Sequence, residues 1–164
     1  MHRSGSSALT QALTESGAFV GEPDELLPAA DDNITGFFER QDALSINRAL
    51  MSGAGGDWWR LARLELDTIP KDTLEDCRKR FDKMVARLDR ADLWALKDPR
   101  LCLVLPKILD LLSAPVAIVV YRNPLDVAQS LYQRNNMAIS EGLALWDAYY
   151  RAAEIDGASR WKTF

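Results

Sequence analysis

Apolar residues recur at helical spacing along several stretches of the chain. The clearest stretch runs from about Asp72 to Arg90, where one face is apolar and the opposite face carries solvated lysine and arginine side chains. The members of this apolar stripe are Leu74, Cys77, Phe81, Met84, Val85 and Leu88. Similar patterns predict helices over residues 8–13, 41–51, 58–64, 101–112 and 124–134, and a last helix from about residue 140.

Two shorter stretches have the composition of buried β-strands. Residues 116–121 are apolar throughout and rich in β-branched side chains, which is typical of a central parallel strand. Residues 93–97 form a second apolar stretch. Strands that alternate with helices predict an α/β fold, a parallel sheet flanked by helices, in a single domain over residues 1–164. The Pro-, Asp- and Gly-rich residues 21–38 predict a long loop that covers or forms a binding site.

The amino-acid composition excludes several classes of protein function. The chain has 164 residues, 48% of them hydrophobic, and a net charge of -4, which argues against nucleic-acid binding through a broad basic face. Two cysteines and one histidine cannot make a disulfide framework or a four-cysteine zinc site, and we expect no metal. No apolar run is long enough to span a membrane and no signal peptide is recognisable, so we expect a soluble, cytoplasmic protein without a membrane partner.

Residues 3–7, Arg-Ser-Gly-Ser-Ser, lead into a helix and are suited to binding an anion. Gly5 permits a close approach of the backbone, the helix N-terminus presents amides, and the hydroxyls of Ser6 and Ser7 add donors. A nucleotide-hydrolysing P-loop has lysine at the position of Ser6. Here the cation, Arg3, comes earlier, so the loop can cradle phosphate but lacks the usual means of assisting ATP hydrolysis. A plain helix cap is the alternative interpretation.

Two more candidate sites follow the predicted strands, at the sheet edge where ligands bind in α/β proteins. Arg122 follows residues 116–121, and Ser130 lies in the next predicted helix. A guanidinium and a hydroxyl that converge suit a phosphate monoester. The alternative for Arg122 is an ion pair with Asp126. The segment 97–100, Lys-Asp-Pro-Arg, ends the other strand and has a structural turn as its alternative.

Three segments together resemble the sulfotransferase family. They are residues 1–9 (MHRSGSSAL), 97–100 (KDPR) and 121–131 (YRNPLDVAQSL). The resemblance is to bacterial members with a His-Arg-Ser-Gly-Thr-Ser loop, and it covers most of the chain. Residues 33–39 (NITGFFE) are also similar to a segment of that family.

This resemblance implies a P-loop-like α/β domain that moves a sulfuryl group from 3′-phosphoadenosine-5′-phosphosulfate (PAPS) to a hydroxyl or amine, releases 3′,5′-ADP and needs no metal. The residues that would hold the 5′-phosphosulfate are Arg3, Ser4, Gly5, Ser6 and Ser7. Arg122 and Ser130 would hold the 3′-phosphate, and Lys97 would lie against the sulfuryl group. Arg3 would also neutralise charge on the leaving phosphate, because in-line transfer needs cations at the leaving oxygen. The acceptor implied is a small molecule or a carbohydrate.

The transfer also needs a base for the acceptor proton, and the resemblance offers two glutamates. Glu39 ends the segment 33–39, and Glu22 lies at about the distance from the loop where tyrosylprotein-type members keep a glutamate. Glu39 is preferred over Glu22, and a solvated loop charge is the alternative for each. His2 precedes the loop and is expected to support it.

The chain departs from the family pattern at both ends. No strand precedes the loop, and the chain ends at residues 160–164, where another strand is expected, so we expect a partial domain. Two other functions stay open. A P-loop nucleotide kinase would bind ATP with magnesium, which Ser6 in place of lysine disfavours, and a non-catalytic nucleotide-binding or scaffold domain would keep the fold without the reaction.

Overall fold

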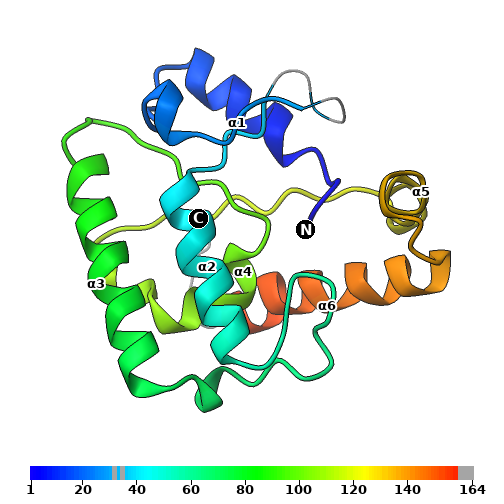
Figure 1. The fold of residues 1–164 in the computed structure, drawn as a ribbon. Helices are drawn as coiled ribbons and strands as arrows, with labels where there is room; N and C mark the ends of the chain where they lie inside the picture. Colours follow the sequence, from blue (N-terminus) through cyan, green and yellow to red (C-terminus); the bar gives the residue numbers. More distant parts are fainter. Residues whose placement is uncertain (31–32, 34–35, 159–164) are drawn as a thin grey trace.

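The computed structural model describes residues 1–30, 33 and 36–158, with side chains as far as Glu154 (Figure 1). The predicted strand near residues 160–164 lies outside these residues. The long helices are α1 (Ser6–Glu15), α2 (Gln41–Gly53), α3 (Lys71–Leu88), α5 (Pro124–Asn135) and α6 (Ile139–Ala158). The short ones are α4 (Leu101–Val104) and the 3₁₀ turns η1 (Pro23–Glu25), η2 (Leu66–Thr68), η3 (Leu105–Lys107) and η4 (Leu109–Leu111). No described helix is long and apolar enough to cross a lipid bilayer.

The predicted parallel sheet is absent from the part of the chain that the structure describes, so the expectation of an α/β P-loop fold is wrong. Its only trace there is a single parallel bridge between Phe19 and Trp94. The N–H of Phe19 donates to the carbonyl of Leu93 at 2.9 Å, and the N–H of Ala95 donates to the carbonyl of Phe19 at 2.9 Å. A single bridge is not a β-sheet, and the described residues form a helical protein.

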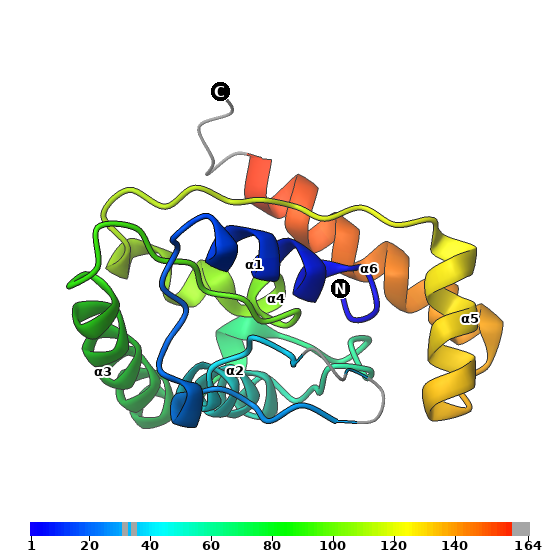
Figure 2. The same ribbon diagram turned by 90° about the horizontal axis from the view of Figure 1, so that it is seen from above.

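The segment predicted as the central strand is extended but pairs with nothing. Residues 112–123 run along one edge of the molecule and lead into α5 (Figure 2). Within the described residues, no main-chain hydrogen bond joins residues 113–122 to another segment. Its apolar side chains are therefore left in solvent, with Val116 77% and Ile118 58% exposed. The composition predicted the extended conformation, but a strand also needs a partner about 4.8 Å away, and composition does not supply one.

The core lies between α2, α3, α4 and α6. The apolar stripe predicted for residues 72–90 is confirmed as the inner face of α3, where Phe81, Met84 and Leu88 are almost completely buried. The helix predicted over 58–64 is wrong, because Asp57 and Arg60 close a tight turn through two main-chain hydrogen bonds. The helix predicted over 101–112 is broken into α4, η3 and η4. Pro106 falls within it and removes a backbone donor.

Helix α5 starts as the sequence predicts and packs closely on α6. The side chain of Asn123 caps α5 by accepting the N–H of Leu125 at 2.9 Å, and Pro124 is its first residue. Gly142 of α6 lies against Ala128 of α5, and a Cβ at Gly142 would come within 2.9 Å of the Ala128 Cα. The contact fixes α5, which carries Ser130.

Replacing Gly142 with alanine is expected to destabilise the protein. The added methyl would meet backbone atoms of α5 that cannot rotate away, and overpacking of this kind costs about 1–3 kcal/mol. That cost exceeds or cancels the gain of about 1 kcal/mol that alanine brings to a helix interior. Thermal unfolding followed by circular dichroism measures the difference. A higher unfolding temperature for the variant would contradict the close approach of α5 and α6.

Candidate functional site

The loop before α1 turns back on itself and leaves its backbone open. Arg3 and Gly5 adopt left-handed conformations, with φ of 63° and 91°. Ser4 is buried, and its hydroxyl donates to the carbonyl of Met1 at 2.8 Å, so this serine shapes the loop. Gly5 occupies the N-cap position of α1 without a capping side chain, and a Cβ there would meet no atom within 4 Å. An anion can therefore approach the first amides of α1 closely.

Three side chains predicted to bind phosphate come together beside this loop. Arg3 donates its Nε–H to the Ser130 hydroxyl at 2.9 Å, across 127 residues of sequence. Arg122 donates from Nη1 to the carbonyl of Arg3 at 3.0 Å, across 119 residues. Two guanidinium groups and a hydroxyl from three separate segments thus share one place, which supplies the charge and the donors that a phosphate monoester needs.

Two aromatic residues of α6 hold the backbone of Arg122. Trp146 donates its Nε1–H to the Arg122 carbonyl at 3.0 Å, and the N–H of Arg122 donates to the Tyr150 hydroxyl at 3.2 Å. The Tyr150 hydroxyl also donates to the carbonyl of Val120. The rings of Trp146 and Tyr150 pack with centroids 4.4 Å apart. The sequence predicts the helix that carries both residues, but not this polar role.

Lys97 joins the loop to the predicted base. Its Nζ donates to the Ser7 hydroxyl at 3.3 Å, to the Phe37 carbonyl at 3.0 Å and to Glu39 Oε1 at 2.7 Å. Lys97 and Glu39 therefore meet, although they are 58 residues apart in the sequence. Glu39 is only 4% exposed, so the solvated alternative for this residue does not describe it.

A buried network continues from Glu39 and fixes the ammonium of Lys97. Arg100 reaches the second carboxylate oxygen of Glu39 at 3.4 Å and pairs with Asp98 at 2.9 Å. Asn47 of α2 donates to the other oxygen of Asp98 at 3.0 Å. Two cations and two carboxylates thus alternate in a charge-balanced row. The sequence signal for Asn47 was a polar residue inside the apolar stripe of α2, and its role in the site was missed.

Glu22 and His2 have supporting roles. Glu22 is exposed and caps η1, its carboxylate accepting the N–H of Glu25 while its own N–H donates to the Glu25 carboxylate at 2.9 Å. His2 packs its ring 4.8 Å from that of Trp58, and burial lowers the pKa of His2 well below its usual value. Burial thus favours the neutral form of this histidine, whose ring also lies 6.3 Å from that of Tyr149.

The segment 33–39 reaches the loop from the opposite side. The amide of Asn33 donates to the Ser7 hydroxyl at 3.3 Å and to the Gly36 carbonyl at 2.6 Å. Residues 34 and 35 lie outside the described part of the chain. With the Phe37 carbonyl, Asn33 completes the set of groups around Ser7 and Lys97. Sequence reasoning singled out this segment without giving Asn33 a role.

The base of the long loop 21–38 is tied to α2 through Arg40. This buried guanidinium binds Glu25 at 2.8 Å and Asp42 at 2.9 Å, and the hydrogen bonds from Arg40 lower the pKa of Glu25 to about 2. The N–H of Leu27 donates to the carbonyl of Glu39 at 2.8 Å. The two ends of the loop are therefore held together next to the site.

No family model, curated protein or solved structure matches this chain. The chemistry of the site is therefore inferred from its own contacts: one cluster of Arg3, Arg122 and Ser130, and a second of Ser7, Lys97 and Glu39.

Proposed function

We propose that this chain binds PAPS at residues 3–7 and transfers its sulfuryl group to a hydroxyl or amine of a small-molecule or carbohydrate acceptor. The observation that carries the proposal is the meeting of Arg3, Arg122 and Ser130 beside the open backbone of Gly5. A second anionic group on the ribose distinguishes PAPS from ATP, and a second cationic cluster beside the loop suits it. The proposal depends on these contacts and not on a sheet.

The donor set fits a ligand with two anionic ends. Arg3 and Arg122 offer planar guanidinium groups, which bind phosphate oxygens in pairs. Lys97 offers a compact ammonium beside the Ser7 hydroxyl, on the side of the loop that faces Asn33 and Phe37. The two clusters are thus assigned to different ends of the nucleotide, Arg122 and Ser130 to the 3′-phosphate and Ser7 and Lys97 to the phosphosulfate.

PAPS supplies a sulfuryl group whose bond to the 5′-phosphate oxygen breaks as the acceptor oxygen or nitrogen bonds to sulfur. Arg3 and Lys97 stabilise the negative charge that develops on the leaving phosphate, as preorganised cations do. Glu39 holds Lys97, and Arg100 in turn holds Glu39, so Lys97 is positioned before the acceptor binds. Of the two glutamates, Glu39 is the one assigned to the acceptor proton, because an acceptor that displaces Lys97 from Oε1 meets a carboxylate oxygen there.

Thermal shifts with three nucleotides test the proposal. We expect 3′,5′-ADP to raise the unfolding temperature at concentrations where ADP has little effect, because only 3′,5′-ADP carries the 3′-phosphate. Preference for ATP with magnesium would favour a kinase, and no shift with any of the three would favour a scaffold. Either of those two results would overturn the proposal.

The variant Arg122→Ala is expected to weaken 3′,5′-ADP binding about 10- to 150-fold. A hydrogen bond to a charged group contributes about 1.5–3 kcal/mol, and each 1.4 kcal/mol is about tenfold in affinity. Isothermal titration calorimetry measures the change, with Arg90→Ala as a control at an exposed position in the turn after α3. Binding of 5′-AMP, which has no 3′-phosphate, should change little. Equal losses for the two nucleotides would contradict the assignment of Arg122.

A further inference from the structure

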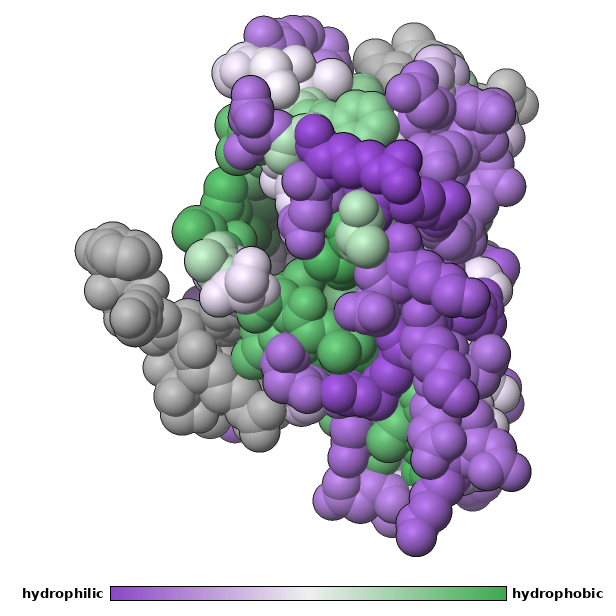
Figure 3. Space-filling view, turned by 90° about the vertical axis from the view of Figure 1, so that its left-hand side faces the viewer, coloured by the Kyte–Doolittle hydropathy of each residue, from purple (hydrophilic) through white to green (hydrophobic). Residues whose placement is uncertain are grey.

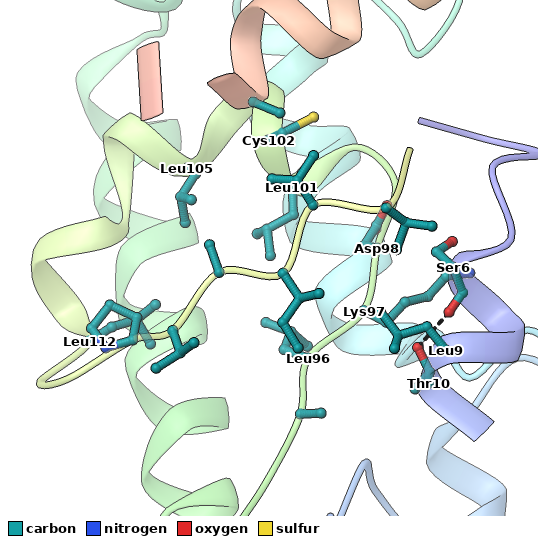
Figure 4. A pocket seen from close by; sticks show the side chains of 18 of the residues that line it. Ser6, Leu9, Thr10, Leu96, Lys97, Asp98, Leu101, Cys102, Leu105 and Leu112 are labelled. Carbon is teal, nitrogen blue, oxygen red and sulfur yellow. Dashed lines mark hydrogen bonds between the residues drawn. The ribbon is translucent and has the colours of Figure 1, made fainter. Parts of the chain in front are cut away.

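A groove runs between the two extended segments of the molecule. Residues 93–97 form one edge of it and residues 114–120 the other (Figure 4). Both segments end at the loop 3–7, since Lys97 Nζ lies 3.3 Å from the Ser7 hydroxyl and Arg122 Nη1 lies 3.0 Å from the Arg3 carbonyl. The two edges therefore run in the same direction. The groove between them has a volume of about 690 Å³.

Both faces of the groove are apolar. Leu9 and Leu13 of α1 line one face, and side chains of α4 and α6, among them Leu101 and Ala152, line the other. Thr10 is the only residue of α1 that is buried, so the leucines of this helix face the groove rather than fill the core. Figure 3 shows an apolar hollow bordered by hydrophilic surface on the side of the molecule that carries α3.

The two edges carry main-chain groups without main-chain partners. In the segment 93–97, Leu93 and Ala95 bond to Phe19, and the alternation of a strand turns the N–H and carbonyl groups of Trp94 and Leu96 the other way. No main-chain hydrogen bond of the described residues uses those groups, or those of residues 113–122, in which the Val120 carbonyl and both main-chain groups of Arg122 bond to side chains of α6 instead. Rows of this kind are templates for an added strand.

We propose that this groove binds an extended apolar peptide, which runs in the same direction as both edges and forms main-chain hydrogen bonds with each. Because both faces of the groove are apolar, the peptide must be apolar at successive positions, and β-branched residues suit the extended conformation. Asp89 and Asp92 line the end of the groove where both edges begin. Their charge complements a cation at the N-terminal end of the peptide. A run of about five to seven residues matches the length of the edges.

This binding mode is a form of strand addition, in which the main chain provides affinity and the side chains provide specificity. It is independent of the nucleotide proposal, because it uses the apolar part of the groove and not the cations of the loop. A second copy of this chain is a less suitable occupant, since its most exposed apolar segment, 116–121, is itself one edge of the groove.

The test uses the synthetic peptide amide Lys-Val-Ile-Val-Val-Ala, with hydrogen exchange measured on the full chain. We expect the peptide to slow exchange of the Trp94 and Leu96 amides on one edge and of amides within 116–121 on the other. A matched peptide that is N-methylated at alternate residues cannot donate these hydrogen bonds and should bind at least tenfold more weakly. Val119→Asp in the groove should abolish binding, whereas Leu125→Asp, at a 49% exposed site outside the groove, should leave it unchanged.

Several results would overturn the proposal. These are no binding of the peptide, binding that protects neither edge or only one, and equal binding of the N-methylated peptide. Protection of residues 116–121 that grows with protein concentration, with no peptide present, would assign this face to a second copy instead. If the Val119→Asp variant does not fold, the affinity of the N-methylated peptide for the unmodified protein still distinguishes strand addition from simple hydrophobic adsorption.

Discussion

Replacement of Glu39 with alanine is expected to lower the free energy of unfolding by about 3–5 kcal/mol. The carboxylate pairs with Lys97 at 2.7 Å and with Arg100 at 3.4 Å, and the side chains of these two cations are only 10% and 6% exposed. Alanine would leave two buried positive charges with Asp98 as their remaining counter-charge. Urea denaturation at neutral pH, followed by tryptophan fluorescence, measures the loss.

An exposed glutamate provides the matched control for this variant. Glu75 lies on the solvent side of α3, and its replacement by alanine should change stability by no more than about 0.5 kcal/mol. A loss below about 1 kcal/mol for Glu39→Ala would mean that water reaches the network and shields its charges.

Under the proposed function, Lys97→Met is expected to lower the rate of sulfuryl transfer about 10²- to 10³-fold, the usual effect of removing one donor from a preorganised site. Methionine keeps the length and apolar stem of lysine, and Arg100 remains to pair with Glu39. The rate is measured as the release of 3′,5′-ADP from saturating PAPS in the presence of phenol, alcohol and sugar acceptors.

Two further measurements separate a catalytic role of Lys97 from a structural one. The affinity for 3′,5′-ADP should change little, because Arg3, Arg122 and Ser130 are untouched. The variant Lys97→Arg keeps the positive charge and should recover part of the rate. A variant that loses nucleotide affinity and rate to the same degree would instead point to disruption of the loop.

The helix predictions were correct where the apolar period was long and regular, and wrong where local residues formed a turn or broke the helix. The stripe of α3 is long and regular, so its buried face follows from spacing alone. Trp58, Leu61 and Leu64 have the same spacing, yet the hydrogen bonds between Asp57 and Arg60 make a turn there. The sheet failed for another reason. Residues 116–121 have the composition of a strand, but pairing depends on a neighbour that composition does not reveal.

Part of the site could be predicted, because the sequence motifs place polar and charged residues where the predicted helices and strands begin or end. Arg3, Arg122 and Ser130 meet in the structure although no local pattern connects them. The residues that hold these groups were not predictable in the same way. Trp146 and Tyr150 look like core residues in the sequence, and only the structure shows their polar atoms on the backbone of Arg122.

Because the base of the loop 21–38 is anchored, the length of the loop can vary at a small cost in folding free energy. Arg40 ties the turn at Glu25 to α2, and the hydrogen bond from Leu27 to Glu39 already brings the two ends together. The entropy of closing a flexible loop grows only with the logarithm of its length. Residues added between positions 28 and 30 therefore change folding free energy little, because the contacts of Asn33 and Phe37 with Ser7 and Lys97 are kept. Under the proposed function, the preference for the acceptor can diversify through the length of this loop while the scaffold stays the same.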